Sequence, residues 1–144
     1  MHHDAKRALR LARLVATLLY VEALAVYPLL GRVLGPLFSA RPEVTRFVGP
    51  VLLGAGVAAY AFSLLLEHRM LARAALAAGS PARAFVAAIP VASCGNALGT
   101  FGLVLTLLGA PGFGAALYVL CAAHGLHLML RWPNYEQAAH QMPE

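Results

Sequence analysis

Apolar residues fall in four long blocks along the chain, separated by shorter connections that hold most of the charged, proline and glycine residues. Each block is close to the roughly 20 residues that an α-helix needs to cross the hydrocarbon core of a bilayer. The blocks contain no Lys or Arg except Arg10 and Arg13 at the start of the first, where long side chains reach the interface. The four blocks are Leu9–Leu30, Phe47–Leu66, Ala84–Leu108 and Phe113–Leu130. The pattern predicts an all-α, four-helix transmembrane bundle that forms a single integral membrane domain over residues 1–144.

Composition supports a membrane protein rather than a soluble helical one. The chain is 60% hydrophobic and only 12% charged, far from the average soluble domain. A soluble core of four such helices is the alternative, but the charged residues are too few to coat it with a polar surface.

The distribution of the basic residues predicts the orientation in the membrane. Eight of the 11 Lys and Arg residues lie in the N-terminal segment, in the second connection or after the fourth block, and three lie in the first connection. The positive-inside rule then places both termini in the cytoplasm, and we expect a multi-pass protein of a bacterial inner membrane. No basic face with interleaved aromatic residues is present, so a nucleic-acid partner is not expected. The lipid bilayer is the expected partner of the basic residues.

Small residues form a continuous face on the third block, because their spacing alternates between four and three. A face of this kind lets another helix approach closely within a membrane. It predicts close helix packing and a homo-oligomer, or contact with other membrane subunits. A second close-packing surface is expected at Gly54 and Gly56 in the second block. The members of the first face are Ala88, Ala92, Gly95, Gly99, Gly102, Thr106 and Gly109.

Proline and glycine predict where the helices bend or end. Pro28 lacks the backbone donor and clashes with the carbonyl of Leu24, so a kink or an early end is expected there. Residues 79–81 read as a helix C-cap, an N-cap and a first helical proline. The sequence GAPG at 109–112 predicts a tight turn that makes the third and fourth blocks antiparallel neighbours.

A few polar residues interrupt the apolar blocks at mid-depth. Glu22 and Asn96 each lie about 13 residues into their blocks, and His124 and Tyr60 come to a similar depth from the other side. Ionisable residues at this depth are candidates for a functional site. We therefore predict a polar cluster that binds a proton or cation, and Tyr20 or Tyr27 could supply a hydroxyl to Glu22. The alternative is that these groups only hydrogen-bond neighbouring helices and fix their packing, each contributing roughly 0.6–2 kcal/mol.

The first and third blocks also resemble each other. When VEALAVYPLL is set over GNALGTFGLV, Glu22 falls on Asn96, Tyr27 falls on Phe101, and the offset is 74 residues. The match indicates two duplicated helical hairpins in parallel orientation.

The segment around Glu22, with the pattern E-A-L-x-V-Y, resembles the ion-binding helix of the rotary ATPase proteolipids, the c-type and K-type subunits. The resemblance implies that Glu22 binds a proton or sodium ion. The hairpin of the second and third blocks also looks like a proteolipid hairpin, with Asn96 in the place of its carboxylate. The chain is also similar to small four-span bacterial membrane proteins of unknown function. This similarity lies in the tract GNALGTFGLVLTLLG of the third block and in LMLRWPNYEQ at the end of the fourth block.

Other chemistry has less support in the sequence. Cys121, His124 and His127 step by three along one helix, and this spacing alone does not bring them together, so neither a metal nor a haem cofactor is expected. Cys94 and Cys121 are expected to be separate small thiols. No nucleophile has an acid–base partner at a useful spacing, so no enzyme activity is predicted. The leading hypothesis is a proteolipid-like protein that binds or conducts a proton or cation at Glu22. The alternatives are a non-catalytic membrane scaffold or assembly protein and a small-molecule transporter.

Overall fold

The computed structural model describes residues 2–38, 42–76 and 82–140, and all the regular structure in these residues is helical. The first helical rod consists of α1 (His2–Val21), a π-helical turn η1 (Glu22–Val26), α2 (Tyr27–Leu34) and a 3₁₀ turn η2 (Gly35–Leu37). The second begins with a π-helical turn η3 (Val44–Val48) and continues as α3 (Gly49–Leu76). The third and fourth are α4 (Ala82–Leu107) and α5 (Pro111–His140). The predicted all-α, four-helix architecture is confirmed.

Each rod contains a segment that is long and apolar enough to cross a membrane. The segments are Arg7–Leu37, Thr45–Ala72, Ala88–Leu107 and Pro111–Gln137. Large apolar side chains are exposed on all the rods, among them Leu29, Val51, Val104 and Val119. Such a surface fits a lipid environment, because soluble proteins rarely expose extended apolar patches.

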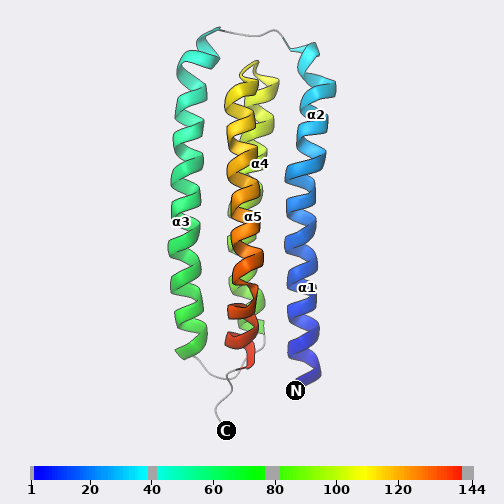
Figure 1. Cartoon of the computed structure of the whole chain (residues 1–144), viewed down its shortest axis with the longest axis vertical. Coiled ribbons are helices and arrows are strands. Elements are labelled where there is room, and N and C mark those ends of the chain that lie inside the picture. Colours follow the sequence, from blue (N-terminus) through cyan, green and yellow to red (C-terminus); the bar gives the residue numbers. More distant parts are fainter. Residues whose placement is uncertain (1, 39–41, 77–81, 141–144) are drawn as a thin grey trace.

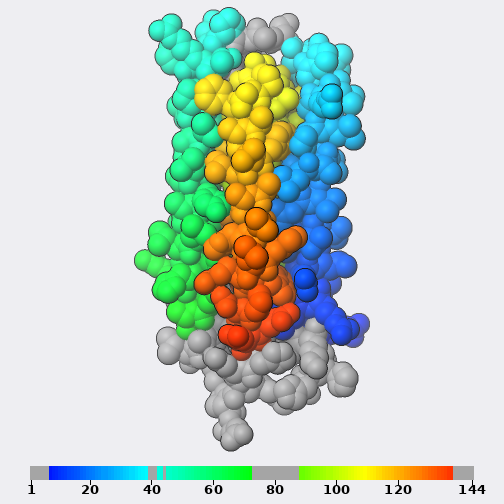
Figure 2. Space-filling model, viewed as in Figure 1, coloured from blue at the N-terminus to red at the C-terminus, as the bar shows by residue number. Residues whose placement is uncertain are grey.

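The four rods run up and down, with α4 and α5 in the middle of the bundle (Figure 1). The contact between α4 and α5 is the most extensive in the molecule, and α4 also packs against α1, α2 and α3. Figure 2 shows the surface of α5 between the surfaces of α3 and α1. We call the end where α1 begins and α5 ends the terminal end, and the opposite end, with the connection from α4 to α5, the turn end. In this order α1 is parallel to α4, and α3 is parallel to α5. Two duplicated hairpins would have these helix directions, but so would any up-and-down bundle, so the directions do not distinguish the predicted duplication.

The first rod does not end at Pro28, as the sequence suggested it could. It passes the proline through η1, where the N–H of Tyr27 bonds to the carbonyl of Glu22 five residues earlier. The wider π turn accommodates a residue that has no backbone donor and whose ring disturbs the preceding turn. The turn η3 directly precedes Gly49 and Pro50 in the same way.

The predicted turn between the third and fourth blocks is a Schellman motif followed by a proline at the first position of α5. Gly109 has a positive φ of 86°. The N–H of Ala110 bonds to the carbonyl of Leu105 at 2.8 Å, and the N–H of Gly109 bonds to the carbonyl of Thr106 at 3.2 Å. This pair of bonds satisfies two carbonyls at the end of α4. The caps predicted at residues 79–81 lie outside the described residues.

The small-residue face of α4 is covered within the chain. Ala88, Ala92, Gly95, Gly99 and Gly102 are all buried. A Cβ atom on Gly99 would lie 2.5 Å from the Cβ of Ala23 in η1, and one on Gly102 would lie 2.9 Å from the ring of Tyr118 in α5. This face therefore joins α4 to the first rod and to α5, so it is not open to a second copy of the chain as the sequence suggested.

The two glycines singled out in the second block differ in their surroundings. Gly56 is buried, and a Cβ atom there would meet the side chain of Leu117. Gly54 is exposed, and a Cβ atom there would meet no described residue within 4 Å. Only Gly56 lies at a helix contact within the chain.

Candidate functional site

The side chain of His124 in α5 joins three helices in the interior of the bundle. It is fully buried, with 0% of its surface exposed. Its Nε2 atom lies 2.6 Å from Oγ of Ser63 in α3. Its Nδ1 atom makes a hydrogen bond with the hydroxyl of Tyr20 in α1. Both ring nitrogens therefore have partners, each from a different helix.

One assignment of the protons satisfies all the hydrogen-bond partners in this group. The hydroxyl of Ser63 donates to the carbonyl of Tyr60 at 2.7 Å, so its oxygen is left to accept from the Nε2–H of His124. The Nδ1 atom then accepts from the hydroxyl of Tyr20. In this arrangement each polar hydrogen of Tyr20, His124 and Ser63 has an acceptor. It corresponds to a neutral imidazole, because a neutral ring has one donor and one acceptor. We call Tyr20, His124 and Ser63 the histidine chain.

Two glycines and an aromatic ring shape the space around the histidine chain. A Cβ atom on Gly95 of α4 would lie 2.8 Å from Nδ1 of His124 and would collide with the hydroxyl of Tyr20. A Cβ atom on Gly125 of α5 would lie 2.9 Å from the ring of Tyr20. The ring of Tyr60 meets the imidazole edge-on, with centroids 5.4 Å apart and planes at 72°. The phenol of Tyr20 reaches His124 because both glycines leave room for it.

A second polar group lies closer to the terminal end, between α3 and α5. The carboxylate of Glu67 in α3 is 3% exposed. Nε2 of His127 lies 2.8 Å from one of its oxygens, and Nε of Arg131 lies 3.5 Å from the other. His127 and Arg131 are partly exposed, at 32% and 45% of their side-chain surface. We call these three residues the carboxylate cluster. It links a buried acid to two basic groups that reach the surface.

The two groups form one polar stripe because α3 and α5 are parallel. The bonded pairs Ser63–His124, Glu67–His127 and Glu67–Arg131 are separated by 61, 60 and 64 residues. At a rise of 1.5 Å per residue, His124 lies ~20 Å and Arg131 ~30 Å along α5 from Pro111. Since the hydrocarbon core of a bilayer is about 30 Å thick, the stripe runs from the interior to the terminal end.

Of the four residues predicted for a mid-depth cluster, the structure brings His124 and Tyr60 together. Glu22 is exposed on the outside of the first rod. Its neighbour Ala23 is buried and packs against Gly99, whereas Glu22 itself is exposed and so points away from α4. The expectation that Glu22 faces protein is therefore not met within the single chain. Asn96 is half-buried, and its Oδ1 atom is buried without a hydrogen-bond partner among the described residues.

Sequence reasoning missed Ser63 and Glu67 and considered Tyr20 only as a partner of Glu22. The signal was present, because Ser63 and Glu67 are four residues apart and so share one face of α3. His124, His127 and Arg131 repeat at steps of three and four on α5. Two polar stripes of the same spacing on parallel helices indicate that the helices face each other.

The sulfur and imidazole groups of α5 do not converge on a metal. Cys121 and Cys94 are free thiols, the first buried and the second partly buried. No group of three His, Cys, Asp or Glu side chains is placed to hold a metal ion within residues 2–38, 42–76 and 82–140. His124 and His127 instead have the hydroxyl and carboxylate partners described above.

Comparisons with protein-family models, with curated proteins and with solved structures give no match to this chain.

Proposed function

We propose that this four-helix membrane protein binds a proton reversibly at the Glu67–His127 pair. The observation that carries the proposal is the contact of 2.8 Å between a carboxylate that is 3% exposed and an imidazole that is 32% exposed. Histidine is the side chain whose protonation ordinarily changes near neutral pH. The ring lies directly against a buried carboxylate, and about a third of the His127 side chain is exposed on the surface of the bundle toward the terminal end. Arg131 balances the carboxylate when the ring is neutral.

The histidine chain extends this site toward the interior of the bundle. Ser63 is one helical turn from Glu67, and His124 is one turn from His127. All the hydrogens of the chain point the same way, from Tyr20 through His124 to Ser63 and the carbonyl of Tyr60. Chains of such groups serve as proton relays in membrane proteins. Proton binding at Glu67–His127 would place a positive charge one helical turn from the histidine chain. If the protein conducts protons, the histidine chain would carry them farther into the bundle.

The orientation is part of the proposal and depends on the charge distribution. By their positions in the helices, Arg10, Arg13, Arg69 and Arg131 lie toward the terminal end, whereas Arg32 and Arg46 lie toward the turn end. The positive-inside rule then puts the terminal end in the cytoplasm of a bacterial inner membrane. The site would exchange its proton with the cytoplasm.

The test is a potentiometric titration of the purified protein in detergent between pH 5 and 8. The wild type is expected to take up about one proton per chain more than the His127→Gln variant over this range. Glu67→Gln keeps an oxygen acceptor for His127 but removes the charge, so a titration curve that differs from the wild type would assign the carboxylate a part in proton binding. Glu136→Gln, an exposed carboxylate on the same helix as His127, is the matched control. Identical curves for the wild type and His127→Gln would overturn the proposal.

Conduction is tested separately in vesicles that enclose a pH-sensitive dye, with a potassium diffusion potential as the driving force. Proton flux that is lost in both Glu67→Gln and Tyr20→Phe would extend the proposal from binding to conduction. Proton uptake in detergent without flux would limit the protein to proton binding.

A membrane scaffold or assembly role is a second candidate, and the position of Glu22 favours it. This carboxylate is exposed among apolar residues that include Val21, Val26 and Leu29. An acid at the centre of a membrane helix costs about 2.5–3.5 kcal/mol, and contact with a second copy or another subunit would reduce that cost. The proteolipid resemblance is a special case in which the chain forms a ring. Native mass spectrometry of the wild type and of Glu22→Gln tests self-association through this residue: a monomer in both would exclude contact with a second copy, including a ring.

A further inference from the structure

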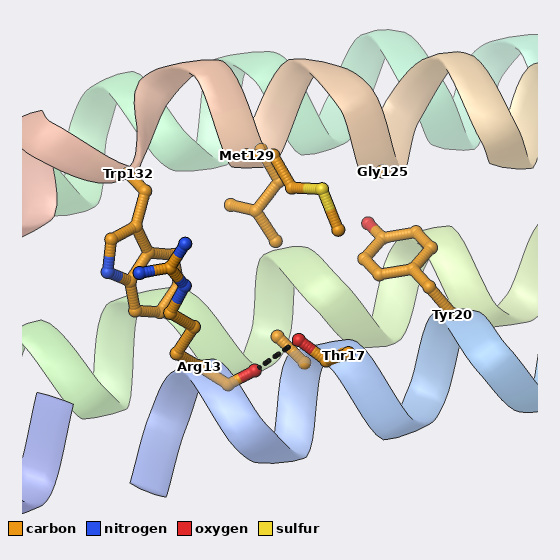
Figure 3. Close-up of a pocket in the computed structure, with 8 residues that line it drawn as sticks. Arg13, Thr17, Tyr20, Gly125, Met129 and Trp132 are labelled. Atoms are coloured by element: carbon orange, nitrogen blue, oxygen red, sulfur yellow. Dashed lines mark hydrogen bonds between the residues drawn. The ribbon is translucent and has the colours of Figure 1, made fainter. Parts of the chain in front are cut away.

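A cavity of about 140 Å³ lies between α1 and α5 (Figure 3). Arg13 and Trp132 lie at one end of it, and Tyr20 and Gly125 lie at the other. The former end is the terminal end, since Arg13 is near the start of α1 and Trp132 near the end of α5. The remaining lining residues are Ala16, Thr17, Leu128 and Met129.

The polar chemistry of the cavity is concentrated at the terminal end. Arg13 is the only charged residue among those that line it. The hydroxyl of Thr17 donates to the carbonyl of Arg13 at 2.8 Å, and the hydroxyl of Tyr20 bonds to His124, so both have partners within the protein. The walls between the two ends are formed by Leu128, Met129 and Ala16. An occupant would therefore place an anionic group at Arg13 and an apolar segment toward Tyr20.

The size and surroundings of the cavity point to a lipid. A cavity of about 150 Å³ holds one benzene molecule, so this space suits a short apolar segment and not a whole headgroup. Arg13, Thr17 and Met129 are exposed, so the cavity opens between the helices on the lipid-facing surface. Arg13 also lines a shallow hollow of about 350 Å³ on α1, together with Arg10, Thr17, Leu14 and Leu18. Arg13 thus stands between two apolar hollows, which is the arrangement that a headgroup with two acyl chains requires.

We propose that this cavity is a binding site for a phospholipid with a net anionic headgroup. The phosphate would lie at Arg13, one acyl chain would enter the cavity toward Tyr20, and the other would lie over Leu14 and Leu18. Basic residues near a membrane surface favour anionic over zwitterionic lipids. Tryptophan is typical of the interface at which a headgroup lies, and Trp132 is at that end of the cavity. The site is independent of the proton site, although its inner wall is the tyrosine of the histidine chain.

Trp132 provides the measurement, because it is the single tryptophan of the chain. The purified protein in detergent is titrated with phosphatidylglycerol that carries bromine atoms on its acyl chains, which quench tryptophan fluorescence at short range. Brominated phosphatidylcholine is the zwitterionic comparison. We expect saturable quenching by both lipids. Half-maximal quenching should require an about fivefold lower concentration of phosphatidylglycerol than of phosphatidylcholine, because one arginine near the surface favours an anionic lipid by about this factor.

The variants test whether Arg13 is the origin of the preference. Arg13→Gln is expected to lose the fivefold difference and Arg13→Lys to keep it, since the point charge is retained. Arg32→Gln, an exposed arginine at the turn end, is the matched control and should behave as the wild type. Thr17→Leu narrows both hollows and should weaken quenching by both lipids. Equal quenching by the two lipids in the wild type, or an unchanged preference in Arg13→Gln, would overturn the proposal. Displacement of the brominated lipid by inorganic phosphate alone would also overturn it, because the ligand would then be a free anion.

Discussion

Ser63 of α3 and His124 of α5 are joined by a hydrogen bond of 2.6 Å, although 61 residues separate them in the sequence. The serine donates its own proton to the carbonyl of Tyr60 in the preceding turn. Its oxygen is then the acceptor for the only N–H of a fully buried ring. The bond connects helices on the two sides of the polar stripe and sets the tautomer of His124.

Removal of this acceptor should destabilise the protein. In Ser63→Ala the Nε2–H of His124 is left buried and unpaired, and hydrogen bonds between membrane helices contribute about 0.6 kcal/mol on average and up to about 1.7 kcal/mol. We expect a loss near the upper value, because the ring is completely buried. The measurement is the free energy of unfolding in mixed detergent and SDS micelles. Ser93→Ala is the control, since Ser93 is exposed and its hydroxyl donates to the carbonyl of Ile89 in its own helix.

A methyl group at Gly95 should be more harmful than the loss of the serine hydroxyl. It would lie 2.8 Å from Nδ1 of His124 and would collide with the hydroxyl of Tyr20. Overpacking of this kind costs about 1–3 kcal/mol, because two buried side chains must move. Gly54→Ala is the matched control in α3, as nothing lies within 4 Å of the added atom. If both variants unfold at the same SDS fraction as the wild type, the contact between α4 and the histidine chain is looser than these distances indicate.

The architecture could be predicted because it depends on block length and on local turn chemistry. Four apolar blocks of near-membrane length can only be helices in a bilayer, since lipid offers no partner for an open backbone. The turn at Gly109 follows from a residue without a Cβ atom and a proline two positions later. The small-residue face of α4 can be recognised from its spacing alone, but spacing does not say whether the neighbour is the same chain or another one. The burial of Gly99 against Ala23 answers that question within the chain.

The polar site could be predicted only in part, because the rotation of each helix decides which polar residue faces inward. Glu22 is the most conspicuous acid in the sequence, and it faces outward because Ala23 takes the contact with α4. Glu67 is easily overlooked because it lies just after the apolar block Phe47–Leu66, where an acid looks like an interface residue. It is buried because α3 continues to Leu76 and stays beside His127 and Arg131 of α5. Element lengths and helix rotation are tertiary properties that a hydropathy pattern does not contain.

A side chain at Gly109 should destabilise the turn between α4 and α5. The residue has a φ of 86°, a conformation that costs other residues about 1–2 kcal/mol. Gly109→Ala is therefore expected to lower the free energy of unfolding by about 1 kcal/mol. Gly112→Ala, three residues later in the first turn of α5, should have no such effect, because its Cβ atom would meet nothing within 4 Å in the part of the chain that the structure describes. Equal effects of the two variants would contradict the role of the positive φ.

The Glu67–His127 contact should appear as an energetic coupling in a double-mutant cycle. The cycle compares Glu67→Gln, His127→Gln and the double variant, with the free energy of unfolding measured at pH 6 and at pH 8. Residues that share a hydrogen bond or ion pair give coupling energies of about 0.5–3 kcal/mol. The coupling should be larger at pH 6, because a protonated imidazole adds a charge interaction with the carboxylate to the hydrogen bond. A ring that has released its proton keeps only the hydrogen bond.

A second cycle between Glu67 and Arg131 provides the comparison. Arginine stays protonated at both pH values, so this coupling should not change between pH 6 and pH 8. The distance of 3.5 Å and the 45% exposure of the arginine side chain also make it the weaker of the two. A Glu67–His127 coupling that is the same at both pH values would mean that the ring does not change its charge in this range. The pair would then hold α3 to α5 as a fixed hydrogen bond, and the proposed proton site would have to be abandoned.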